Sequence, residues 1–400
     1  MTKFTKESID DKRKKVELKI AAFIAEHCSI NTVNHLGEVV KSLDEDSQTL
    51  KNVKVHRSKC TAVIFNVLSP CLLDDLIDDI GNSHYSLIID ETTTVDTKKI
   101  MCIMIRYFSK NFHKVRTTFY RLVELDSGTA EQMTSSLKEQ LQKDGLTLDK
   151  LLGIGIDGSN AMAGEHNSVS SKLREISPHL ITIKCVPHSL HLCAERTCDI
   201  LPKNLDFLVK ESHSWFSKST KRKIDYNRLH KIIADSNPRK IAKLSGTRWL
   251  ARLNAIDMIL DQWDVLELHF NTYRISERGD PGFKAESLYQ MYRCIENKVY
   301  LVFLRYALKD VISLNKLFQS ESVEPLKLLQ DLNNLLYSTL QKIIIPHQLL
   351  KAQDLSSFKF QDHLMSVNCV NFGFYFYELS NQCNPETLPI IKQRCRDFLI

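Results

Sequence analysis

The chain has 400 residues, of which 43% are hydrophobic and 26% are charged, and its formal net charge is +6. A chain of this length suggests two or three domains, since it outgrows a single compact core. The composition excludes extensive disorder, and the basic excess permits contact with nucleic acid while lying far below that of a histone-like binder.

Neither a membrane span nor a signal peptide is expected. No stretch approaches the apolar length needed to cross a bilayer, and the N-terminal residues Met-Thr-Lys-Phe-Thr-Lys-Glu lack the apolar core of a signal peptide. The eleven cysteines are odd in number and irregularly spaced, which is typical of reduced thiols in cytosol or nucleus. We therefore expect an intracellular protein without a membrane partner.

Helical spacing dominates the first 80 residues. Apolar residues at Val16, Ile20 and Ile24 supply one helical face, and the leucines and isoleucine within 72–77 mark another helix before Gly81. We predict an N-terminal helical segment over residues 1–80.

Strand signals begin after Gly81, and the order of the following elements indicates an α/β fold. Three strands with short links predict an antiparallel meander, and the alternation of helices and strands after it predicts a mixed sheet covered by helices. The expected strands are 85–90, 100–108, 115–125, 151–156 and 180–186, with helices at 130–143 and 169–176. This is the element order of an RNase H-like core, whose first part we place at 81–200.

Beyond His188 the apolar residues follow a helical period. The clearest segments are 250–268, 288–317 and 326–350, separated by Gly and Pro residues at 278–282 and 345–346. We predict a mainly α-helical insertion domain over 201–400, which stops before the end of the core.

Two aspartates, Asp90 and Asp157, each end the apolar run of a predicted strand. A strand end is a rigid mount, and carboxylates on neighbouring strands can hold divalent metal for phosphoryl transfer. Each also has an ordinary explanation, because Asp90 can cap the polar turn and Asp157 can open an Asx turn that leads into a helix. The pair makes polynucleotide chemistry, or a relic of it, the leading hypothesis.

Cys185, His188, His191 and Cys193 place four soft ligands at the end of the last strand. Their spacing is not that of a usual zinc finger, and a helix beginning near Pro187 would splay the side chains. We therefore favour a structural pair of Cys185 and His188 that supports the aspartates, and zinc is the minor alternative.

Two basic motifs lie in the second half of the chain. Trp249 either packs in the helical domain with Arg248 at its rim, or it stacks on an exposed base while Arg248 contacts phosphate. The densest basic cluster consists of Lys218, Lys221, Arg222 and Lys223. Such a cluster is usually a solvated face, and otherwise it is a contact to a nucleic-acid backbone or a nuclear-import patch.

Taken in order, these motifs resemble the hAT family of DNA transposases and the host proteins derived from them, including zinc-finger proteins with transposase-like bodies. The matching segments are 86–94, 155–162, 185–192 and 247–249, and the resemblance covers residues 10–270 well. It implies an RNase H-like core in which Asp90 and Asp157 are the first two of three acidic metal ligands. It also implies that Trp249 stacks on a base flipped out at the transposon end.

The sequence departs from this family pattern in two ways. We find neither the third carboxylate and dimerisation region that follow the helical insertion nor an N-terminal Cys/His finger for site-specific DNA binding. Two-metal strand transfer needs ions about 3.5–4 Å apart, and two ligands leave the second ion poorly fixed. Nothing in the context of Glu91 or Glu324 singles out either residue as a substitute.

We therefore expect a transposase-derived nuclear protein that no longer transposes and acts as a DNA- or protein-binding module with protein partners. One alternative is a fragment of an active hAT-type DNA transposase or nuclease that depends on Mg2+ or Mn2+. A second, from another class, is a zinc-stabilised protein-interaction domain.

Overall fold

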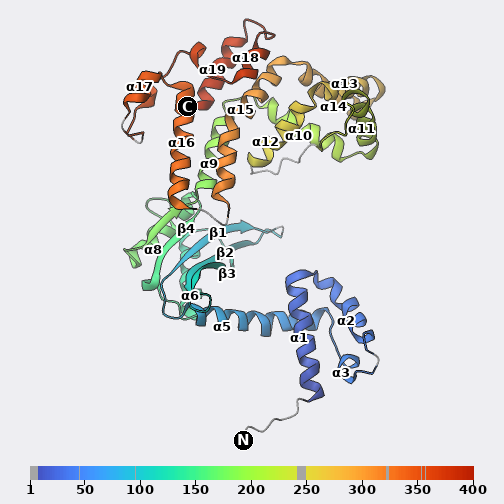
Figure 1. Ribbon diagram of the computed structural model, residues 1–400, viewed down its shortest axis with the longest axis vertical. Helices are drawn as coiled ribbons and strands as arrows, with labels where there is room; N and C mark the ends of the chain where they lie inside the picture. The colour runs from blue at the N-terminus through green and yellow to red at the C-terminus, as the bar shows by residue number, and fades with distance from the viewer. Residues whose placement is uncertain are drawn as a thin grey trace. The chain divides into compact units, whose positions relative to one another are not determined.

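The computed structural model describes residues 8–44, 46–94, 96–240, 249–320, 324–352, 354–355 and 357–400. The chain divides into two compact units, Met1–Lys184 and Cys185–Ile400 (Figure 1). We call them the sheet unit and the helical unit. The boundary falls at the end of the last strand, so the helix that follows this strand belongs to the helical unit.

The sheet unit begins with a small group of helices. They are α1 (Ile9–His27), the 3-10 turn η1 (Ile30–Thr32), α2 (Val33–Ser42), α3 (Gln48–Lys51) and α4 (Arg57–Val63). Ser8 caps α1, because its side chain accepts a hydrogen bond from the amide of Asp11. A core of its own, which includes Ile24, Val33 and Cys60, holds the group together.

A single long helix leads from this group to the sheet. It runs through α4, the π-helical turn η2 (Ile64–Leu68) and α5 (Ser69–Ile80). By length and composition alone, the helix Arg57–Ile80 is long and apolar enough to cross a membrane, and little of it is buried. The expectation that no stretch reaches this length was therefore wrong, because the helix continues through the polar Asn66 and Ser69 and through Pro70.

Five strands form one mixed sheet in the order β3-β2-β1-β4-β5. The strands are β1 (Tyr85–Thr93), β2 (Lys99–Ser109), β3 (Lys114–Leu125), β4 (Leu151–Ile156) and β5 (Ile181–Lys184). β1, β2 and β3 pair antiparallel, whereas β4 is parallel to both β1 and β5. The predicted α/β fold, an RNase H-like mixed sheet with flanking helices, is confirmed.

Side-chain alternation gives this sheet two different faces. Leu87, Ile103 and Ile105 are fully buried on one face, in a core with α6 (Ala130–Lys143) and α8 (Val169–Ile176). The remaining short elements of this unit are η3 (Leu148–Lys150) and α7 (Asn160–Ala163). Ile88 and Asp90, at the alternate positions of β1, are exposed on the opposite face.

The second unit is mainly helical, as predicted. Its helices are α9 (Val186–Cys198), α10 (Asn204–Ser217), α11 (Thr220–Ala234), α12 (Trp249–Asp261), α13 (Trp263–Ser276), α14 (Gly279–Arg293), α15 (Ile295–Phe318), α16 (Pro325–Ile343), α17 (Pro346–Lys351), α18 (Phe374–Ser380) and α19 (Leu388–Leu399). Short 3-10 turns are η4 (Phe360–His363) and η5 (Val367–Cys369). Trp215, Phe270 and Phe303 are among the fully buried side chains of its core.

The predicted helix over 250–268 is in fact two helices that meet at Gln262. Its buried side-chain amide donates to the carbonyl of Met258 at 2.9 Å and to that of Arg239 at 3.0 Å. These bonds satisfy backbone groups where the chain changes direction. The helical spacing of apolar residues continues through the break at Gln262, so the sequence pattern did not reveal the break.

Candidate functional site

Asp90 and Asp157 lie at the same edge and on the same face of the sheet. The parallel register of β1 and β4 pairs Ile88 with Gly155. Two residues further along, Asp90 lies within β1 and Asp157 directly follows β4. Because side chains alternate with a period of two, both carboxylates belong to the face opposite the helix-covered core.

The two carboxylates have different surroundings. Asp90 is exposed opposite Cys102 of β2, and burial, followed by the charge of Asp90, raises the pKa of the Cys102 thiol. One oxygen of Asp157 accepts from the amide of Ser159 at 3.0 Å and from its hydroxyl at 2.7 Å. Ser159 in turn caps α7, so Asp157 forms the Asx turn that its sequence context indicated.

Among the residues that the structure describes, this edge supplies two carboxylates for a divalent metal, Asp90 and Asp157. Glu91 lies on the opposite face, where it pairs with Met101 and binds Lys99 at 2.8 Å. Glu324 is the N-cap residue of α16. Within the described ranges, no three His, Cys, Asp or Glu side chains converge well enough to hold a metal ion. The residues present do not complete a two-metal site.

The segment from Cys185 to Cys193 forms the start of α9. Cys185 is the N-cap residue, and Cys185 and Cys193 are both exposed. The rings of His188 and His191 lie 6.5 Å apart, and burial lowers the pKa of His191. The helix predicted near Pro187 is confirmed, while the supporting role of Cys185 and His188 stays a prediction.

The basic cluster, which extends from the end of α10 into the first turn of α11, contains two kinds of side chain. Lys218, Lys221 and Lys223 are exposed. The guanidinium of Arg222 instead lies over the ring of Trp215, 3.6 Å from its centroid. Three members of the predicted cluster are thus available to a ligand, and Arg222 belongs to the packing of the unit.

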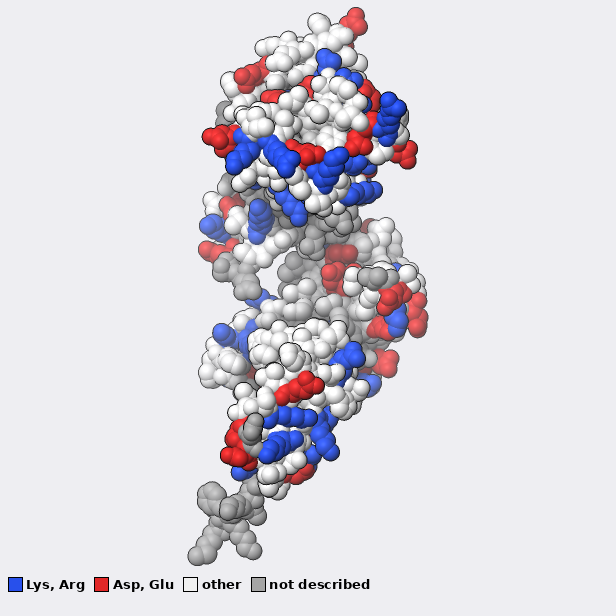
Figure 2. Space-filling model, turned by 90° about the vertical axis from the view of Figure 1, so that its right-hand side faces the viewer, with Lys and Arg blue, Asp and Glu red and all other residues white. Residues whose placement is uncertain are grey.

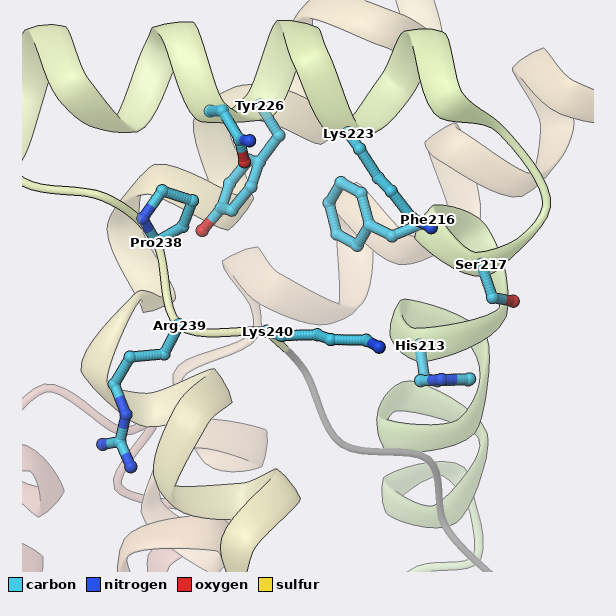
Figure 3. Close-up of a pocket in the computed structure, with 9 residues that line it drawn as sticks. His213, Phe216, Ser217, Lys223, Tyr226, Pro238, Arg239 and Lys240 are labelled. Carbon is cyan, nitrogen blue, oxygen red and sulfur yellow. The ribbon is translucent and has the colours of Figure 1, made fainter. Parts of the chain in front are cut away.

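A cavity of about 440 Å³ opens beside this cluster, and we call it the α11 cavity. It is lined by His213, Phe216, Ser217, Lys223, Tyr226, Asn227, Pro238, Arg239 and Lys240. Figure 3 shows Lys240 extending across the cavity toward His213, while Arg239 points away from it. Sequence reasoning missed Arg239 and Lys240, although a basic pair directly after Pro238 was a visible signal.

The charges of the α11 cavity are unbalanced. Arg239 forms an ion pair with Asp261 at 2.8 Å. Neither Lys223 nor Lys240 has a carboxylate within ion-pair distance in the described part of the chain, and no acidic residue lines the cavity. Two ammonium groups around one opening favour a ligand with negative charge.

The predicted Arg-Trp motif is only partly described. Arg248 lies outside the described residues. Trp249 is the first residue of α12, and its side chain is likewise outside the description. Their stacking and phosphate roles therefore stay predictions.

A comparison with protein families bears on the sheet unit. Residues 18–168 match a known family model. Its description is "ZMYM1/FAM200, RNase-like domain". The match extends from α1 through Asp157 and agrees with the observed sheet, which supports an RNase-like, transposase-derived origin for this part of the chain. The narrower resemblance to hAT transposases stays a prediction.

Proposed function

We propose that this protein is a transposase-derived nuclear protein that binds DNA through its helical unit and does not transpose. The observation that carries the proposal is the α11 cavity, whose lining includes Lys223 and Lys240, two lysines without an ion pair among the described residues. Lys218 and Lys221 extend the positive charge over the neighbouring surface. Figure 2 shows many lysine and arginine side chains across one face of the helical unit, with acidic side chains among them.

Phosphate is the group that this arrangement suits best. A lysine ammonium is a compact charge that contacts phosphate oxygens without reading the base sequence. Binding of several phosphates releases counterions, so the affinity should fall steeply as salt is raised. The function is therefore backbone binding, and protein partners would add selectivity.

The loss of transposition is supported by the edge of the sheet. Asp157 already accepts two hydrogen bonds from Ser159, and Glu91 faces the opposite side. An ion held only by Asp90 and Asp157 would lack the fixed partner that an in-line displacement needs.

A metal-dependent nuclease is the second candidate, because Asp90 and Asp157 hold matching positions on parallel strands. Cleavage of plasmid DNA by the purified chain in Mg2+ or Mn2+ tests it. Robust cleavage that disappears in Asp90→Ala would favour the nuclease over the binding module.

The DNA-binding proposal is tested by fluorescence anisotropy with a labelled duplex at several salt concentrations. We expect Lys223→Glu with Lys240→Glu to weaken binding at least tenfold, about 1.4 kcal/mol, and to flatten the salt dependence. The matched control is Lys327→Glu, which reverses an exposed lysine on α16 of the same unit. Equal affinity of the double variant and the wild type would contradict the proposal.

A further inference from the structure

A second cavity of about 510 Å³ lies in the helical unit, between α12, α15 and the start of α18. We call it the α18 cavity. Its lining combines two cations, one carboxylate and several aromatic rings, among them Asp257, Arg305, Tyr306, Lys309, Phe374 and Tyr375. This lining differs from that of the α11 cavity, which combines cations with the rings of Phe216 and Tyr226 and includes no carboxylate among the described residues.

Two of these aromatic rings face solvent. Phe374 is 77% exposed and Tyr375 is 59% exposed. Their ring centroids are 5.5 Å apart and the rings are nearly perpendicular, at 78°. The contact is edge-to-face, and the guanidinium of Arg305 lies over the Tyr375 ring, 5.9 Å from its centroid. The exposed ring surface that remains can stack on a planar ligand.

The backbone that carries the two rings is firmly anchored. Phe372 and Phe376, on either side of them, are fully buried. Gly373 has a φ of +93°, and a Cβ at this position would lie 2.8 Å from the ring of Tyr306. The exposed pair is therefore a rigid platform and not a loose loop.

A line of charges connects the two cavities. Asp261 accepts from Arg239 of the α11 cavity at 2.8 Å and from Arg305 of the α18 cavity at 3.5 Å. Lys309 continues the line without an ion pair in the described part of the chain. Arg239 and Arg305 thus share the carboxylate of Asp261, and Asp257 is a second carboxylate at the α18 cavity. The cations without an ion pair in the described part of the chain are Lys223, Lys240 and Lys309.

We propose that the DNA held by the helical unit is an unpaired strand, whose phosphates follow these cations from the α11 to the α18 cavity and whose bases stack on Phe374 and Tyr375. The proposal rests on the DNA-binding function above. In a duplex the bases stack on each other, whereas an unpaired strand offers base faces to aromatic rings. Asp257 adds an acceptor for an N–H group on the edge of an unpaired base, such as N3–H of thymine.

Fluorescence anisotropy of the full chain with labelled oligo-dT, and with a duplex of the same length, tests this inference. We expect tighter binding of oligo-dT and about a tenfold loss in Phe374→Ala and in Tyr375→Ala, with little change for the duplex. The matched control is Phe283→Ala, because Phe283 on α14 is 78% exposed and lies outside both cavities.

The outcomes separate the two proposals. Absence of binding to either DNA would remove the proposed function itself. Binding that depends on Lys223 and Lys240 but not on Phe374 or Tyr375, or that prefers the duplex, would overturn only the unpaired-strand inference. Ring-dependent binding of oligo-rU that is tighter than that of oligo-dT would identify the strand as RNA and overturn the assignment to DNA.

Discussion

Trp215 donates its indole N–H to Nε2 of His269 at a distance of 3.0 Å, inside the core of the helical unit. Both side chains are buried, and the rings of Phe270 and Tyr273 lie against both. Burial lowers the pKa of His269 to about 3, while the charge of Asp225 opposes this shift. His269 is therefore a neutral acceptor in the folded protein.

Because the pKa of His269 is lowered in the folded protein, we expect the protein to lose stability in acid. The unfolded chain takes up a proton below pH 6.5, whereas the folded chain resists it down to about pH 3. The contribution of neutral His269 to the free energy of unfolding is complete above pH 6.5. Below pH 6.5 this contribution falls by about 1.4 kcal/mol for each pH unit. Urea unfolding at pH 7 and pH 5 measures the effect. His269→Gln keeps an acceptor without titrating, and parallel pH curves for this variant and the wild type would refute the assignment.

Neighbouring residues of the basic cluster should behave differently. Arg222→Ala removes a guanidinium that stacks on Trp215, so we expect about 1 kcal/mol less stability. Lys223→Ala removes an exposed side chain and should change stability by less than about 0.5 kcal/mol. Urea midpoints of the two variants give the comparison, and equal midpoints would show that Arg222 is only a surface charge.

The platform of the α18 cavity depends on Gly373. We expect Gly373→Ala to cost about 2 kcal/mol or more, because it adds a positive-φ strain and a contact with Tyr306. Gly279→Ala is the control, since Gly279 also has a positive φ but has open space around it, and it should cost about 1 kcal/mol. Thermal unfolding of both variants measures the difference between their losses of stability. Equal losses would show that Tyr306 moves aside freely and that its contact with Gly373 adds no cost.

Substitutions of Asp90 and Asp157 should differ in their effect on stability. Asp157→Ala removes two hydrogen bonds from Ser159 and should cost about 1 kcal/mol, whereas Asp90→Ala at an exposed position should be nearly neutral. Addition of Mg2+ or Mn2+ should leave the thermal midpoint of the wild type unchanged. A metal-dependent rise that Asp90→Ala abolishes would instead reveal a bound ion.

Several elements could be predicted from local pattern. The strand over 151–156 was predicted with its observed bounds, because an apolar run between polar turns is a local signal. The break at Gln262 was missed, because its hydrogen bonds reach back to Arg239, which lies 23 residues earlier. The apolar pattern marked a helix before Gly81 only within 72–77, so the continuity of Arg57–Ile80 was missed.

By itself, the sequence determined the order of the strands, the mixed sheet and the places of Asp90 and Asp157 near the carboxyl ends of β1 and β4, although β1 continues past Asp90 to Thr93. These properties follow from periodicity and chain order, which are local. Only the tertiary structure decided which face Glu91 takes, and that Lys223 and Lys240 surround one cavity. It also joined Arg239 to Arg305 through Asp261, because strand register and helix packing bring together residues whose spacing along the chain carries no signal.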